Sequence, residues 1–253
     1  MKRSLLFLLI GLLVAGSVSL SCSPPPPQEI TVATNGAYPP FTFIDEQTGK
    51  LAGFDIDLMN AIAQVKNLKV NFVKVEFQPL MEGMAQGKYD AAISAITITE
   101  ERKKDMLLTD PYFITGQVAI VRKDNTTITG KDDLAAKVVG VETASTGAAS
   151  VSTIKDIKVK EYADLSQAFN DLMNNTIDAV VCDVGVASYY VEKYPDKLKI
   201  AVVRFTEEYY GIAVNKNEPD LLKKINAGLS TVGTAGLIRE LGFKWLHIQS
   251  VTP

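Results

Sequence analysis

The sequence predicts an α/β fold in two lobes, and three observations support this prediction. From Glu29 onward, short runs of β-branched residues alternate with helical patterns, which is typical of largely parallel sheets covered by helices. A weak internal repeat, 80–94 and 172–182, twice gives a helix, a turn and a short apolar strand. Two similar apolar segments, 116–121 and 209–214, are interpreted as strands that cross between the lobes.

The first lobe begins with strands and helices in alternation. Strands are expected at 30–33 and 70–75, and helices at 57–65 and 80–85. In the first helix, Leu58, Ile62 and Val65 follow one another at spacings of four and three residues, which predicts one buried stripe.

The two crossover strands set the expected lobe boundaries. Residues 29–119 and 213–253 are predicted to form the first lobe, and residues 120–212 the second lobe, inserted within it. Helices at 218–231 and 234–241 would complete the first lobe. Ligands of open α/β sheets bind beyond the carboxyl ends of strands, so the residues after Ser94 and Cys182 are the first places to look for a site.

The amino terminus has the features of an export signal. Lys2 and Arg3 precede a mostly apolar run from Leu5 to Leu20, and small residues surround Cys22. The run is shorter than the roughly 18 residues expected of a spanning helix. We expect residues 1–21 to be a signal peptide and residues 22–28 to be a stiff Pro-rich tether.

Cys22 lies where such a signal would be cleaved. Bacterial lipoproteins have a Cys at this place that receives lipid, which predicts lipidation of Cys22 and anchoring at the periplasmic or outer face of the cell membrane. Ordinary cleavage nearby, with a soluble exported product, is the alternative. Cys182 is the only other Cys, so a lipidated Cys22 excludes a disulfide within the chain.

Composition excludes several classes of function. The net charge is −3 and no basic patch is present, so nucleic acid is not an expected partner. The single histidine, His247, excludes a Ser-His-Asp triad and a His-based metal cluster. No Gly-rich phosphate-binding loop occurs. We therefore expect no metal and no cofactor, and nothing in the sequence indicates an assembly larger than a monomer.

Five short motifs occur in a specific order along the chain. They are Tyr38-Pro39-Pro40-Phe41, Gly53-Phe54-Asp55-Ile56-Asp57-Leu58, Thr97-Ile98-Thr99 with Arg102 three residues on, Asp110-Pro111-Tyr112 and Val139-Gly140-Val141. Together they resemble the polar amino-acid receptors of bacterial ABC importers, solute-binding protein family 3. The resemblance covers nearly all of the mature chain.

The resemblance implies the type II periplasmic-binding-protein fold, in which two mixed sheets flanked by helices are joined by two crossover strands. It also implies a function: the substrate-binding subunit of an amino-acid ABC transporter, which captures a free amino acid between closing lobes and docks on a membrane permease.

Arg102 is the first candidate binding residue, because a guanidinium offers a planar fork that matches a carboxylate. In the family, the Arg at this place holds the ligand's α-carboxylate; a solvated charge in the run 100–105 is the alternative. Ser145 and Thr146 open a predicted helix whose hydroxyls and N–H groups favour an anion, although capping of the helix alone would also place them there. The family usually has Gly where this chain has Ala144.

Asp183 follows a buried apolar strand and needs a positive partner. The resemblance assigns it to the ligand ammonium; capping of the next helix is the alternative. Ala95 and Thr97 match positions whose carbonyl and side chain complete the ammonium site. Tyr38 and Phe77 match aromatic positions that enclose the ligand's aliphatic stem, although Phe77 taken alone would be interpreted as a core residue.

Two residues bear on the ligand's side chain. Asn35 ends the first strand, and Glu142 ends the strand 138–141, where a carboxylate in the cleft would favour a cation. We expect a polar ligand: arginine, lysine or ornithine if Glu142 faces the cleft, and glutamine if it faces solvent. A dehydratase of cyclic, prephenate-like acids and a ligand-sensing domain are the alternative functions. The family pattern supplies only Asp183 as an acid in the cleft, so an enzyme is not expected.

Overall fold

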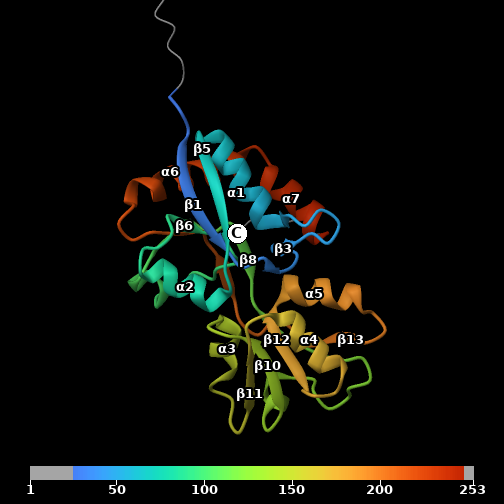
Figure 1. Ribbon diagram of the computed structural model, residues 1–253. Helices are drawn as coiled ribbons and strands as arrows, with labels where there is room; N and C mark the ends of the chain where they lie inside the picture. Colours follow the sequence, from blue (N-terminus) through green and yellow to red (C-terminus); the bar gives the residue numbers. More distant parts are fainter. Residues whose placement is uncertain (1–24, 248–253) are drawn as a thin grey trace, which may run out of the picture.

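The structure is a computed structural model that describes residues 25–247. Two five-stranded sheets, each with helices packed against it, form two lobes that lie one above the other in Figure 1. The predicted signal peptide and Cys22 lie outside the described residues. Between residues 25 and 247, the helices are all too short or too polar to cross a membrane.

The first sheet has the strand order β5-β1-β6-β15-β7. Its members are β1 (Gln28–Thr34), β5 (Leu68–Lys74), β6 (Ala91–Ala92), β7 (Leu107–Leu108) and β15 (Ala213–Val214). β1 runs parallel to β5 and β6, whereas β15 is antiparallel to β6 and β7. The sheet is therefore mixed, and its fourth strand comes from a distant part of the chain.

Helices cover both faces of this sheet because side chains along a strand alternate between its faces. On β1, Ile30 and Val32 join the cluster that contains α1 (Phe54–Val65), and Ala33 joins the cluster that contains α2 (Phe77–Ala85). The carboxyl-terminal helices α6 and α7 pack on α1. Their bounds are Pro219–Thr234 and Leu237–Leu246.

The buried stripe of α1 differs from the predicted one. Leu58 and Ile62 are buried, but Val65 is 46% exposed, because the helix ends there and the chain turns into β5. The helix also begins three residues earlier than expected, directly after Gly53. Gly53 has φ +125°, and a Cβ atom at this position would lie 2.2 Å from the Phe41 carbonyl oxygen. Only glycine fits this junction between the first two motifs.

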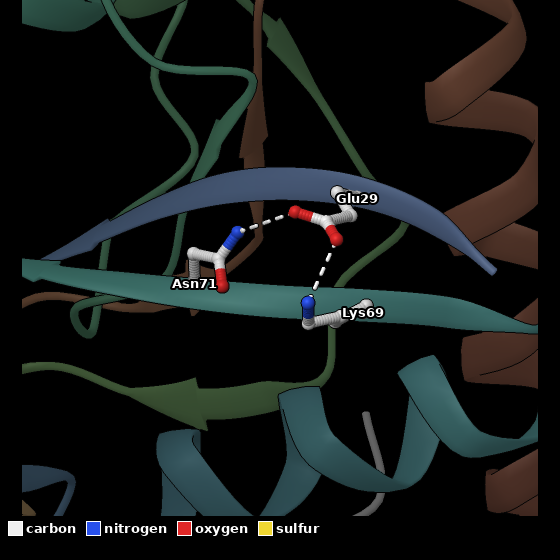
Figure 2. A network of polar contacts seen from close by, with 3 residues as sticks. All are labelled: Glu29, Lys69 and Asn71. Carbon is white, nitrogen blue, oxygen red and sulfur yellow. Dashed lines mark hydrogen bonds and ion pairs between the residues drawn. The ribbon is translucent and has the colours of Figure 1, made fainter.

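The amino-terminal end of β1 carries an exposed polar network (Figure 2). Glu29 pairs with Lys69 Nζ at 2.7 Å and accepts a bond from Asn71 Nδ2 at 3.4 Å, both across the β1–β5 ladder. Exposed ion pairs contribute little to stability. The register of these strands therefore depends mainly on their buried side chains.

The second sheet has the order β11-β10-β12-β9-β13. Its strands are β9 (Gln117–Arg122), β10 (Val138–Glu142), β11 (Lys158–Tyr162), β12 (Ala179–Asp183) and β13 (Leu198–Val202), and its helices are α3 (Thr146–Val151), α4 (Leu165–Met173) and α5 (Val184–Lys193). β10 runs parallel to β11 and β12, and β9 is antiparallel to β12 and β13. All five strands come from one continuous stretch of chain.

Two short strands join the lobes. β8 (Phe113–Thr115) pairs antiparallel with β14 (Glu208–Tyr210), and Figure 1 shows β8 between the lobes. The predicted crossover segment 116–121 is wrong in position, because most of it is β9 of the second sheet. The segment 209–214 covers most of β14 and all of β15. Apolar residues continue from β14 through Ile212 into β15, so hydrophobicity gives no sign of that junction. β8 and β9 meet at Thr115-Gly116-Gln117, a break in the apolar run that marks the junction the prediction missed.

The remaining elements are short. A three-stranded sheet and two 3₁₀ helices complete the described chain: β2 (Ala37–Tyr38), β3 (Thr42–Ile44), β4 (Leu51–Ala52), η1 (Arg102–Lys104) and η2 (Lys131–Leu134). With two mixed sheets, flanking helices and two crossover strands, the predicted fold class is confirmed.

Candidate functional site

A narrow cavity lies between the lobes. Its walls are formed by Tyr38, Phe77, Ser94, Ala95, Thr97, Arg102, Glu142, Ser145, Thr146 and Asp183. Nine of the ten predicted ligand-site positions therefore meet in one place, and the tenth, Asn35, is bonded to the cavity residue Glu142. Glu142 and Asp183 are the last residues of two parallel strands of the second sheet, as expected for a site at strand ends.

Hydrogen bonds cross the cleft from one lobe to the other. They join Tyr38 Oη to Asp183 Oδ2 (2.5 Å), Asn35 Nδ2 to Glu142 Oε1 (3.3 Å) and Arg102 Nη2 to the Ala144 carbonyl oxygen (3.4 Å). The hydroxyl oxygens of Thr97 and Thr146 lie 3.3 Å apart across the same cleft. The lobes are thus closed on each other.

Arg102 begins η1 and is partly buried at the cavity wall. Its Nη1 donates to the Thr97 carbonyl oxygen at 2.8 Å, and the guanidinium carbon lies 5.4 Å from the centre of the Phe77 ring. Burial lowers the pKa of Arg102, while the charges of Asp183, Glu208 and Glu142 act in the opposite direction. A guanidinium has five N–H donors, so donors remain for a ligand carboxylate.

Asp183 ends β12 and is almost fully buried. It accepts bonds from Tyr38, from Thr115 Oγ1 (3.2 Å) and from Gln117 Nε2 (3.2 Å). Burial raises the pKa of Asp183 to about 7, and the charge of Glu208 adds to the rise. Within residues 25–247 no base forms an ion pair with Asp183. A buried carboxyl group without a cation favours a positively charged ligand group.

Asp183 and Ser145 differ in whether they cap the helix that follows them. Asp183 precedes α5 but makes no side-chain capping bond to it, so its capping role is wrong. Ser145 does cap α3, because its Oγ accepts a bond from Ala148 N at 3.0 Å. Ser145 therefore has a structural role besides its place at the cavity.

Glu142 faces the cavity and is only 5% exposed, so the alternative that it points to solvent is wrong. Burial raises its pKa well above the usual range, and the charges of Asp183 and Asp164 act in the same direction. Asn35, which bonds Glu142, has a buried Oδ1 atom with no hydrogen-bond partner in the described part of the chain. Such an acceptor beside a carboxyl group suits a donor-rich cation.

Two alanines at the site have positive φ, +49° at Ala95 and +61° at Ala144. This region is unfavourable for residues with a Cβ atom, so the Gly expected at position 144 from the family resemblance would adopt it more easily than Ala. Ala95 N donates to the buried Asp55 at 2.7 Å, and Asp55 also accepts a bond from Tyr112 Oη at 2.9 Å. The motifs containing Asp55 and Tyr112 therefore hold the backbone at Ala95.

Sequence reasoning missed three polar residues of this region. Ser94 lines the cavity, and its Oγ accepts a bond from Asn35 N at 3.0 Å. Gln117 and Glu208 bond cavity residues from behind. Gln117 lies near the start of the predicted strand 116–121, which was the only signal for it, whereas Glu208 lies just before the predicted strand 209–214 and carried no such signal.

The comparison with protein families agrees with this geometry. The profile of the bacterial extracellular solute-binding proteins, family 3, matches residues 30–248. The chain belongs to this family.

Similar proteins of this family span most of the chain. An "Arginine-binding periplasmic protein" of Mannheimia haemolytica is 32% identical over 251 residues, covering 97% of this chain and 99% of the relative. A "Probable histidine-binding protein" of Neisseria gonorrhoeae is 35% identical over 210 residues, 81% of this chain and 78% of the relative. The solved structure "An ancestral arginine-binding protein bound to arginine" has a TM-score of 0.82 at 41% identity, covering 86% and 97% of the two chains.

Outside the cavity, the described part of this family-3 protein has few groups that could bind a metal or react as a nucleophile. Between residues 25 and 247, no group of three or more His, Cys, Asp or Glu side chains is placed to hold a metal ion. Cys182 is buried with a free thiol, and burial raises its pKa well above the usual range. A protonated, inaccessible thiol is unreactive, so Cys182 serves as a packing residue.

Proposed function

We propose that this protein is the substrate-binding subunit of an amino-acid ABC importer and that it captures a cationic amino acid, with arginine as the first candidate. The observation that carries the ligand class is the pair of buried carboxyl groups at the cavity wall, Glu142 and Asp183. An α-ammonium group can neutralise only one of them. The second suits a cationic side chain, and arginine is the ligand in the names of several relatives.

The proposed roles follow the geometry. Arg102 binds the α-carboxylate, with the Ser145 hydroxyl and the Thr146 backbone N–H group from the second lobe. Asp183 binds the α-ammonium group, with the Ala95 carbonyl oxygen and the Thr97 hydroxyl. Glu142 and Asn35 meet the side-chain cation, and Tyr38 and Phe77 enclose the aliphatic stem.

We also propose that the protein is not an enzyme. The family consists of solute-binding proteins, and the residues of the site support binding rather than turnover. In the proposed complex Asp183 pairs with an ammonium group and is then no general acid. Turnover of a prephenate-like acid by the purified protein would favour the dehydratase alternative, and no family or relative reported above supports a ligand-sensing domain.

Isothermal calorimetry against the twenty amino acids and ornithine tests the function directly. The protein is first unfolded and refolded to remove ligand carried through purification. We expect arginine, lysine or ornithine to bind with the highest affinity and glutamine to follow. Absence of binding below the millimolar range for every amino acid would contradict the function, and preference for glutamate or aspartate would contradict the ligand class.

Export, lipidation of Cys22 and a monomeric state complete the proposal. The charged and apolar amino-terminal sequence motivates export and lipidation. The monomeric state is motivated by the need of the two lobes to close and of the closed protein to dock on a permease. Mass spectrometry of the mature amino terminus distinguishes a lipidated Cys22 from simple cleavage. Light scattering of protein lacking the first 24 residues gives the oligomeric state.

Binding is expected to depend on pH between 5 and 7. In the closed structure without ligand, Asp183 has a pKa of about 7, so below that pH it carries a proton that the ligand ammonium must displace. Affinity therefore rises with pH, by up to about tenfold per pH unit, and levels off above 7. Calorimetry at pH 6 in two buffers of different ionisation enthalpy should detect proton release, and Asp183→Asn should reduce it. Equal observed enthalpies in the two buffers would contradict this linkage.

A further inference from the structure

Glu208 is a buried carboxylate that reaches both lobes from the crossover strand β14. It is 8% exposed. Its Oε2 atom accepts bonds from Thr97 Oγ1 of the first lobe at 2.9 Å and from Thr146 Oγ1 of the second lobe at 2.7 Å. Its Oε1 atom accepts a bond from Thr206 Oγ1 at 2.8 Å. One carboxylate oxygen thus joins two cavity-lining hydroxyls that belong to different lobes.

Glu208 itself is not among the residues that line the cavity. It is held from behind, because β14 pairs with β8 and places Glu208 opposite Thr115, and because Thr206 fixes its second oxygen. The two threonines also lie 3.3 Å apart through their own hydroxyls. The contact between Glu208, Thr97 and Thr146 forms where the two lobes meet, at the crossover strands.

Opening of the cleft would separate Thr97 from Thr146, and Glu208 could then bond only one of them. Two hydrogen bonds to a charged, buried acceptor are therefore complete only in the closed state. An interaction that exists in one conformation and not in the other shifts the equilibrium toward the first. This stabilisation of the closed state requires no contact between Glu208 and the ligand.

We infer that Glu208 is a positioning residue that holds Thr97 and Thr146 together in the closed protein and thereby slows release of the bound amino acid. This inference rests on the proposed function, since it concerns the same cavity. It assigns to the crossover strand a part in retaining the ligand, in addition to joining the lobes.

Two substitutions separate this role from a simple effect of charge. In Glu208→Gln the side chain keeps its length, and its amide oxygen can accept both threonine bonds while its NH₂ group donates to Thr206. In Glu208→Asp the charge remains, but the shorter side chain cannot reach both threonines. Glu207→Asp is the matched control, because Glu207 is the exposed neighbour and bonds only Tyr209 among the described side chains.

The measurement is displacement of labelled L-arginine by excess unlabelled arginine in a rapid-mixing experiment on the full mature protein. We expect Glu208→Asp to release arginine at least tenfold faster than the parent, with an association rate within about threefold of the parent. Glu208→Gln should release it at least fivefold more slowly than Glu208→Asp, and Glu207→Asp should match the parent. In a Thr146→Val background, Glu208→Asp should add less than a threefold change.

Release from Glu208→Gln as fast as from Glu208→Asp would overturn the inference and indicate a role for charge. A full tenfold effect of Glu208→Asp in the Thr146→Val background would also overturn it. Thermal unfolding of each variant with and without arginine identifies any loss of the fold, and Glu208→Gln keeps the comparison decisive if Glu208→Asp is unstable. Failure of the proposed function looks different, because the parent itself would then bind no amino acid.

Discussion

Replacement of Arg102 by Ala should lower the affinity for the amino-acid ligand more than any other single change at the site. The guanidinium is held by the Thr97 carbonyl oxygen at 2.8 Å and lies over the Phe77 ring, so it is already oriented before ligand binds. Removing one member of a buried charge pair costs about 3–5 kcal/mol, which corresponds to a loss of roughly 100-fold to 4,000-fold in affinity. Calorimetry measures the loss directly.

Arg102→Lys distinguishes the planar fork from charge alone. Lysine keeps the charge but cannot form two parallel bonds to a carboxylate, so we expect a loss of at least tenfold. Lys103→Ala is the matched control, since Lys103 is an exposed neighbour paired with Glu100. A lysine variant that binds within about threefold of the parent would show that Arg102 does not bind the ligand carboxylate. Unchanged thermal unfolding should accompany both substitutions of Arg102.

Replacement of Glu142 by Gln should change which amino acid is preferred. Glu142 is buried and its pKa is raised, and no ion pair within residues 25–247 neutralises its ionised form. A cationic side chain would supply that charge. A hydrogen bond to a charged group contributes about 1.5–3 kcal/mol, so the preference for arginine over glutamine should fall by roughly 10-fold to 150-fold. Competition between the two amino acids measures this ratio.

The control for this change is Glu161→Gln, on the exposed edge strand β11 of the same sheet. It removes the same charge from the same lobe at a place away from the cavity, so the ratio should stay constant. An unchanged ratio in Glu142→Gln would contradict a cationic ligand while leaving glutamine as the candidate. In that case Asn35, whose Oδ1 atom has no hydrogen-bond partner among residues 25–247, would be the main contact for the ligand side chain.

Sequence patterns predicted the helices and strands that are determined by residues close together in the sequence. The strand at β1 and the helices α1, α2, α6 and α7 follow from periodicity, which depends on neighbouring residues alone. Errors occurred at their ends. Val65 matches the apolar period of α1 but lies beyond the part of the helix that packs, so burial differs from periodicity there.

The site was predictable where a motif fixed a residue and its chemistry together. Arg102 and Asp183 both reach the cavity, although taken alone Arg102 resembles a solvated charge in its run. Glu208 was missed because Glu207 and Glu208 together resemble a polar end of a strand. Only strand pairing with β8 turns Glu208 inward, and that pairing joins residues about 90 positions apart in the sequence.

The position of β15 determines the order in which the lobes can be completed during synthesis. β15 lies between β6 and β7 of the first sheet, whereas all five strands of the second sheet lie between Gln117 and Val202. During synthesis, every strand of the second sheet is therefore made before β15, the strand that completes the first sheet. Contacts between distant residues form slowly because a long loop must be closed first. Until β15 inserts, the edges of β6 and β7 can pair with the wrong strands. The first lobe, rather than the second, therefore needs protection from misfolding during this interval.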